Sequence, residues 1–189
     1  MKFLQYLFIS LSHKILKLLP YTSIRILSVP IGTLYFLLTF RSSIKLFKRK
    51  EIFNELKINY KPLIVKINYT RYWLETLWLT NKNFSKYISP HVEIENLEYV
   101  EKLKKQYPGL IFALPHLGNW EFAIPIGNSI KLNLLAVAEP LNNSYVLNWF
   151  KSLRESLGIE IIIGGKGQNT FDLLVNKLKS GKDICLLSC

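Results

Sequence analysis

The sequence predicts an α/β fold: a mostly parallel sheet with flanking helices, preceded by N-terminal helices that are basic and apolar. Two observations support this fold class. After Ser89 and Pro90, short apolar runs alternate with segments of helical periodicity in the order β-α-β-α-β-α-β, which is typical of a parallel sheet with right-handed crossovers. Residues 1–87 hold 15 Lys or Arg against 3 Asp or Glu, whereas residues 88–189 hold 10 of each kind. The chain is therefore expected to divide into residues 1–87 and residues 88–189.

Three helices are expected in the first region. Residues 3–19 have apolar side chains at helical spacing and stop at Pro20, residues 24–40 are the most apolar window, and residues 64–80 form an aromatic-rich helix. A window of this length is at the short limit for a membrane span, so an interfacial helix pair is an equally good interpretation. A cleaved signal peptide is not expected, because no small-residue cleavage site follows the first apolar run.

The basic excess of residues 1–87 lies among apolar and aromatic residues. This mixture favours a membrane surface that carries anionic lipids, and we predict that residues 1–87 associate with a membrane. Nucleic-acid binding is the competing interpretation, because a basic stripe is also its electrostatic footprint. We expect no nucleic-acid partner, since the region is too apolar for a duplex-binding face and carries no such motif. The cluster expected to hold lipid head groups, with a solvated helix face as the alternative, is Arg41, Lys45, Lys48, Arg49 and Lys50.

Four strands and three helices are expected in residues 88–189. The strands are 110–114, 134–138, 159–163 and 184–187, and the helices are 119–127, 144–157 and 169–178. Ligands of open α/β sheets bind at the carboxyl ends of the strands. His116 follows the first strand, Glu139 the second, and the turn at residues 164–167 the third, so all three should face one edge of the sheet. This turn is not a P-loop, because Gly167 follows Lys166 where that motif needs Ser or Thr.

His116 and Glu121 form a candidate general-base pair. An imidazole can take a proton from an alcohol near neutral pH, and a carboxylate can orient it and stabilise the imidazolium. Asn119 fits the N-cap of the next helix, and the backbone amides near Gly118 and Asn119 are candidate donors to an oxyanion. His13 and His91 lack such surroundings and are assigned no role.

The two cysteines, Cys185 and Cys189, do not indicate a metal site. A structural zinc site normally needs four ligands in a recognisable spacing, and neither a histidine nor a second cysteine pair is nearby. We expect both to be reduced, packed thiols of a protein that faces the cytosol.

Residues 116–121, His-Leu-Gly-Asn-Trp-Glu, resemble the signature of the glycerolipid and lipid A type acyltransferases. Residues 113–121 are especially similar to the phosphatidylinositol mannoside acyltransferases of actinobacteria, and the resemblance runs from about residue 21 to residue 189. In those enzymes a glutamate and an arginine that match Glu139 and Arg154 are linked to the active site. The resemblance implies that these two are substrate-binding residues able to pair with each other. The family pattern continues beyond residue 189, so the chain is expected to be a fragment or a truncated product.

The resemblance implies a membrane-associated O-acyltransferase at the cytoplasmic face of the bacterial plasma (inner) membrane. It would move a fatty acyl chain from acyl-CoA, or from acyl carrier protein, to a sugar hydroxyl of a glycolipid, with His116 as general base. The implied acceptor is a mannose of phosphatidylinositol mannoside. Lauroyl or myristoyl transfer to a lipid A precursor is one alternative, and a truncated, non-catalytic membrane-bound remnant is another. No metal and no cofactor are implied beyond acyl-CoA as a substrate, and the oligomeric state is left open.

Overall fold

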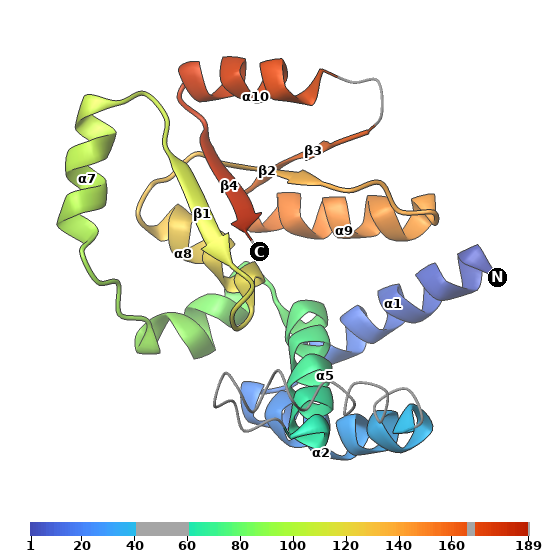
Figure 1. Ribbon diagram of the computed structural model, residues 1–189. Helices are drawn as coiled ribbons and strands as arrows, with labels where there is room; N and C mark the ends of the chain where they lie inside the picture. Colours follow the sequence, from blue (N-terminus) through green and yellow to red (C-terminus); the bar gives the residue numbers. More distant parts are fainter. Residues whose placement is uncertain (41–60, 166–168, 189) are drawn as a thin grey trace, which may run out of the picture. The chain divides into compact units, whose positions relative to one another are not determined.

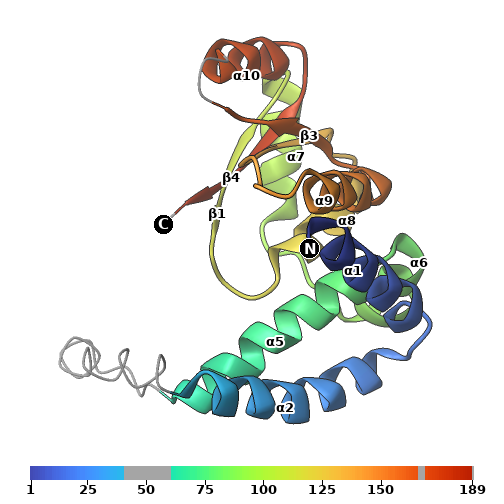
Figure 2. The same ribbon diagram turned by 90° about the vertical axis from the view of Figure 1, so that its right-hand side faces the viewer.

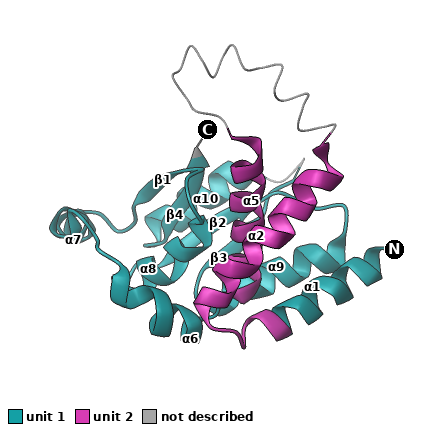
Figure 3. Ribbon diagram, turned by 90° about the horizontal axis from the view of Figure 1, so that it is seen from below, with its two compact units in different colours: residues 1–14, 79–189 teal, residues 15–78 magenta. Residues whose placement is uncertain are grey.

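The computed structural model describes residues 1–40, 61–165 and 169–188. The chain forms two compact units: Met1–Lys14 with Leu79–Cys189, and Ile15–Trp78 (Figure 3). The division at residues 87 and 88, drawn from charge and composition, stays a prediction. The basic cluster at residues 41–50, part of the turn at residues 164–167, and Cys189 lie outside the described residues.

A parallel sheet organises the larger unit (Figure 1). Its strands are β1 (Ile111–Pro115), β2 (Leu134–Ala138), β3 (Glu160–Ile163) and β4 (Asp183–Ser188). The four strands lie in the order β1-β4-β2-β3, and every pairing among them is parallel. In this register Ile184 on β4 pairs with Ile111 on β1 and with Leu135 on β2. The predicted α/β class and parallel sheet are confirmed, and each strand lies within a residue or two of its expected position.

Helices cover both faces of the sheet. In Figures 1 and 2, α8 (Ala123–Ser129) and α9 (Ser144–Leu157) lie on one side of it, and α10 (Thr170–Lys179) lies on the other. The expected helix at residues 144–157 is confirmed, and the one expected at 119–127 begins as a 3₁₀ turn, η3 (Trp120–Phe122), and continues as α8. The helices outside the smaller unit are α1 (Lys2–Leu16, which ends in the smaller unit), α6 (Asn81–Asn83), η1 (Phe84–Ile88), η2 (Ser89–His91), α7 (Leu97–Gln106), η3 (Trp120–Phe122), α8 (Ala123–Ser129), α9 (Ser144–Leu157) and α10 (Thr170–Lys179).

Local sequence signals set the ends and the buried face of α9. The Asn143 side chain accepts hydrogen bonds from two backbone N–H groups of the first turn, and Gly158 ends the helix at φ 103°. Such a left-handed residue after a helix strongly favours glycine. Between the two ends, Phe150, Leu153 and Leu157 recur at helical spacing and are buried in the core. This buried face fixes which α9 side chains reach the interior near the sheet.

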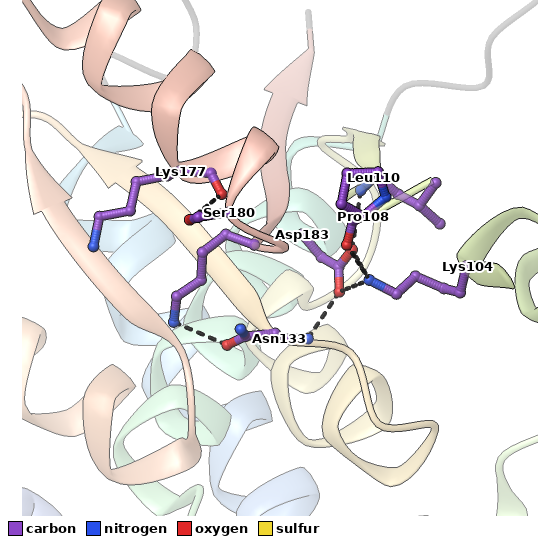
Figure 4. Close-up of polar contacts among 8 residues, drawn as sticks. Lys104, Pro108, Leu110, Asn133, Lys177, Ser180 and Asp183 are labelled. Atoms are coloured by element: carbon purple, nitrogen blue, oxygen red, sulfur yellow. Dashed lines mark hydrogen bonds and ion pairs between the residues drawn. The ribbon is translucent and has the colours of Figure 1, made fainter. Parts of the chain in front are cut away.

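Asp183 ties together the amino ends of three strands (Figure 4). Its side chain is 0% exposed, and its carboxylate accepts from the backbone N–H of Leu110 at 3.0 Å and of Asn133 at 2.8 Å. Lys104 Nζ lies 2.8 Å from the same carboxylate. Leu110 precedes β1 and Asn133 precedes β2, so one buried anion holds the starts of β1, β2 and β4. The contacts at this amino edge of the sheet hold the strands together, and the opposite, carboxyl edge carries the candidate site.

The smaller unit contains a pair of helices, α2 (Tyr21–Leu38) and α5 (Pro62–Trp78), that pack against each other. Gly32 permits the close contact, because a Cβ there would lie only 2.6 Å from Ile67 Cα. The Tyr21 hydroxyl donates to Oε1 of the buried Glu75 at 2.8 Å. By length and composition α2 is able to cross a membrane, and 17% of its apolar window is buried within the protein. Membrane association of this region stays a prediction.

Candidate active site

His116 directly follows β1 at the carboxyl edge of the sheet. The Leu117 N–H donates to the Pro115 carbonyl at 2.8 Å, which makes a tight turn, and Gly118 then adopts φ +61°. A Cβ on Gly118 would meet nothing within 4 Å, so the backbone conformation rather than space requires glycine there. The turn leaves the His116 side chain exposed.

Asn119 begins the next helical segment and caps it, as the sequence predicted. Its side-chain oxygen accepts from the backbone N–H of Glu121 at 3.1 Å. One residue after the cap, the Trp120 ring contacts the His116 imidazole edge to face, with ring centroids 5.5 Å apart and an interplanar angle of 84°. The capped turn therefore places an aromatic ring against the candidate base.

Arg154 holds the Glu121 carboxylate in the interior. The Glu121 side chain is 1% exposed, and Arg154 Nη2 lies 2.6 Å from Oε1. Arg154 Nε lies 3.2 Å from Oε1 and 3.1 Å from Oε2, so the guanidinium engages both oxygens. Charge-assisted, bidentate contacts of this kind are stronger than hydrogen bonds between neutral groups and also fix the orientation of the carboxylate. The segment beside His116 is thus anchored to α9, more than thirty residues further along the chain.

Glu139 and His116 lie at the same edge of the sheet, as predicted, but not on neighbouring strands. Glu139 follows β2 and is exposed. Because β4 lies between β1 and β2, the strands that carry Glu139 and His116 are two spacings, about 10 Å, apart. The structure shows Arg154 bound to Glu121, whereas the resemblance implied a pairing with Glu139. The pairing of Arg154 with Glu139 stays a prediction. So do the catalytic or substrate-binding roles of these two residues, of His116 and of Glu121.

The Glu121–Arg154 pair was not anticipated, although the sequence held a signal for it. Arg154 lies four residues after the buried Phe150 and next to the buried Leu153, so part of its side chain must approach the core. Its guanidinium lies 5.7 Å from the Phe150 ring centroid. A cation brought this close to an apolar interior needs a buried anion, and Glu121 is the carboxylate that supplies it.

The described residues offer no alternative centre of metal or thiol chemistry. Within them, no group of three or more His, Cys, Asp or Glu is placed to hold a metal ion. Burial, and secondly the charge of Asp183, raise the pKa of the Cys185 thiol to about 11. Cys185 is therefore a protonated thiol near neutral pH rather than a nucleophile.

Comparison with known proteins matches nearly the whole chain to one family. The family model described as bacterial lipid A biosynthesis acyltransferase matches residues 2–188. A protein of Mycobacterium tuberculosis (strain CDC 1551 / Oshkosh) named phosphatidylinositol mannoside acyltransferase is 29% identical over 124 residues, which cover 64% of this chain and 39% of that protein. A protein of the same name from Mycolicibacterium smegmatis is 28% identical over 125 residues, covering 64% of this chain and 40% of that protein. The matched part of the chain thus spans about two fifths of the length of these curated relatives.

Proposed function

Because the chain belongs to the bacterial lipid A biosynthesis acyltransferase family, we propose that it carries out O-acyl transfer with His116 as general base. The donor is acyl-CoA and the acceptor is a sugar hydroxyl of a glycolipid. The observation that carries the proposal is the position of His116: exposed, at the carboxyl edge of a parallel sheet, and beside a capped turn that Arg154 anchors through Glu121.

The chemistry requires one proton to move twice. The neutral imidazole of His116 takes the proton of the acceptor hydroxyl as its oxygen forms a bond to the thioester carbonyl carbon. The resulting tetrahedral oxyanion collapses, the carbon–sulfur bond breaks, and the imidazolium returns the proton to the departing CoA thiolate. The products are an ester and free CoA, and the histidine ends in its starting form.

The turn after His116 supports stabilisation of the oxyanion. Gly118 lies two residues from the base in a conformation that glycine favours, and a Cβ placed on it would meet nothing within 4 Å. Among the described residues, its amide makes no hydrogen bond within the chain. A backbone N–H of this kind is the usual donor to the oxyanion of acyl transfer.

The surroundings of the site are suited to a fatty acyl chain. Leu117, which follows the base, is 75% exposed, and Leu141 after β2 and Leu187 near the end of β4 are also exposed. The opposite edge of the sheet instead carries the ion pairs of Asp183 and Glu160. An apolar rim at the catalytic edge gains free energy by covering an alkyl chain, about 0.8 kcal/mol for each buried CH₂.

Two helices support association with a membrane, where glycolipid acceptors reside. The face of α1 that carries Leu4, Phe8 and Leu11 is exposed, with Phe8 at 73%, while Phe3 on another side of α1 contacts Tyr145 of α9. In the smaller unit, α2 exposes most of its large apolar side chains and meets the length and composition of a spanning helix. Such apolar faces, together with the basic excess of residues 1–87, suit an anionic membrane surface. The proposed location is the cytoplasmic face of the plasma membrane.

The names of the relatives favour a mannose of phosphatidylinositol mannoside as the acceptor. The description of the family favours a second candidate, a lipid A precursor. Incubation of the full-length protein with a long-chain acyl-CoA and each acceptor, followed by mass spectrometry of the lipids, separates the two. His116→Ala should abolish acylation, whereas His91→Ala, which changes an exposed histidine outside the site, should not. Acylation that survives His116→Ala, or a wild-type protein that binds vesicles but acylates neither lipid, would contradict the proposal.

A further inference from the structure

His116 lies in an exposed turn at the end of β1. A general base accelerates transfer only while a ring nitrogen points at the hydroxyl that it deprotonates. Two features restrict its backbone: the hydrogen bond between Leu117 N–H and the Pro115 carbonyl, and the left-handed Gly118. The ring itself is contacted edge to face by Trp120, a geometry that aromatic rings prefer.

Trp120 is able to constrain another ring because both of its neighbours in the chain are fixed. Asn119 caps the turn by accepting the Glu121 N–H at 3.1 Å. Glu121 is buried and bound by Arg154 through two guanidinium nitrogens. Arg154 in turn belongs to α9, whose Leu153 is part of the core. The indole is therefore carried by a backbone turn that is tied to the interior of the protein.

We propose that Trp120 is a positioning residue for the general base, holding the His116 imidazole in the orientation that faces the acceptor hydroxyl. This inference rests on the proposed function of His116 and assigns Trp120 a role in the same site. Trp120 takes no part in proton transfer and acts only through the histidine. Its removal therefore lowers kcat and leaves the binding of both substrates unchanged.

The test compares Trp120→Leu and Trp120→Phe with the wild type in the full-length protein. Loss of an aromatic contact of this kind corresponds to a fall in kcat of about threefold to tenfold for Trp120→Leu. Trp120→Phe keeps a ring and should retain most of the wild-type kcat, and KM for acyl-CoA should stay within about twofold in both variants. A Trp120→Leu protein with wild-type kcat, or a Trp120→Phe protein that loses as much as Trp120→Leu, would overturn the proposal.

The chain offers a matched control in a second His–Trp contact. The rings of His13 and Trp149 lie 5.6 Å apart with an interplanar angle of 75°, on α1 and α9. Trp149→Leu removes this contact and should leave kcat unchanged. A loss of kcat equal to that of Trp120→Leu would show that the effect is a general one and would overturn the proposal.

A measurement on the wild type keeps the proposal falsifiable even where Trp120→Leu fails to fold. In the detergent-solubilised protein with labelled histidine and tryptophan, nuclear Overhauser effects should connect the ring protons of His116 and Trp120. Their absence from a folded wild-type protein would contradict the contact. His116→Ala separates the two hypotheses: transfer that survives it overturns the proposed function, whereas transfer abolished by it but unaffected by Trp120→Leu overturns only the role of Trp120.

Discussion

Replacing Arg154 by Met should destabilise the protein strongly, because it leaves the Glu121 carboxylate buried without its cation. Glu121 is 1% exposed and Arg154 is 23% exposed, and the guanidinium contacts both carboxylate oxygens. Removing one partner of a buried ion pair costs about 3–5 kcal/mol of unfolding free energy. Since Arg154 is partly hydrated, we expect the low end, about 3 kcal/mol. For a chain of 189 residues this corresponds to a fall in Tm of about 6–12 °C.

The same helix supplies the control. Lys151 and Glu155 on α9 form an ion pair at 3.7 Å, with side chains 40% and 44% exposed. Exposed helical pairs of this spacing contribute about 0.3–0.5 kcal/mol, so Lys151→Met should lower Tm by no more than about 2 °C. Thermal unfolding followed by circular dichroism in one detergent measures both variants. The double variant Glu121→Gln with Arg154→Met removes the buried charge and should regain part of the loss. Equal Tm values for Arg154→Met and Lys151→Met would show that the buried pair contributes no more than the exposed one.

Three further predictions concern residues away from the candidate base. Asp183→Asn should lower the urea midpoint by an amount equivalent to about 3 kcal/mol, because one buried carboxylate serves three donors; an unchanged midpoint would contradict this. Hydrogen bonds from Lys177 and then Lys182 hold the pKa of Glu160 below its ordinary value. The ionised Glu160 therefore stabilises the fold above the ordinary carboxyl pKa, and this stabilisation is lost as the pH falls through the lowered pKa. The difference in unfolding free energy between wild type and Glu160→Gln should close on acidification from roughly pH 6 to pH 3. A difference that does not depend on pH would contradict this prediction. Cys185 should react slowly with a disulfide reagent in the folded protein, because its pKa is raised to about 11. In a Cys189→Ser variant at pH 8, its rate should be at least about tenfold lower in the folded than in the urea-unfolded protein. Equal rates would disprove this.

The sheet was predictable because its strands carry dense local signals. Each strand is a short apolar run bounded by turn residues, and the order of strands and helices leaves a parallel sheet as the natural arrangement. The cap at Asn119 and the family resemblance of residues 113–121 were equally local, and both are confirmed. The strand order was not predictable, because placing β4 between β1 and β2 depends on contacts between segments distant in the sequence.

The partners of charged residues were the harder part of the site. The motif suggested that Glu121 orients His116, which stays a prediction, and it gave no sign that Arg154 from another helix binds the Glu121 carboxylate. No local sequence signal marks Asp183 either, because its three donors belong to residues far apart in the chain: Lys104, Leu110 and Asn133. Each of these contacts is set by tertiary packing, and neither periodicity nor motif spacing carries that information.

Chemical rescue asks whether the His116 imidazole removes the proton from the acceptor hydroxyl. Acyl transfer by His116→Ala should fall by about 10²–10⁴-fold, while its binding to anionic vesicles stays at the wild-type level. Added imidazole should then restore part of the rate in proportion to its concentration, and should not affect the wild type. Wild-type rates of transfer by His116→Ala without imidazole would show that His116 is not the general base.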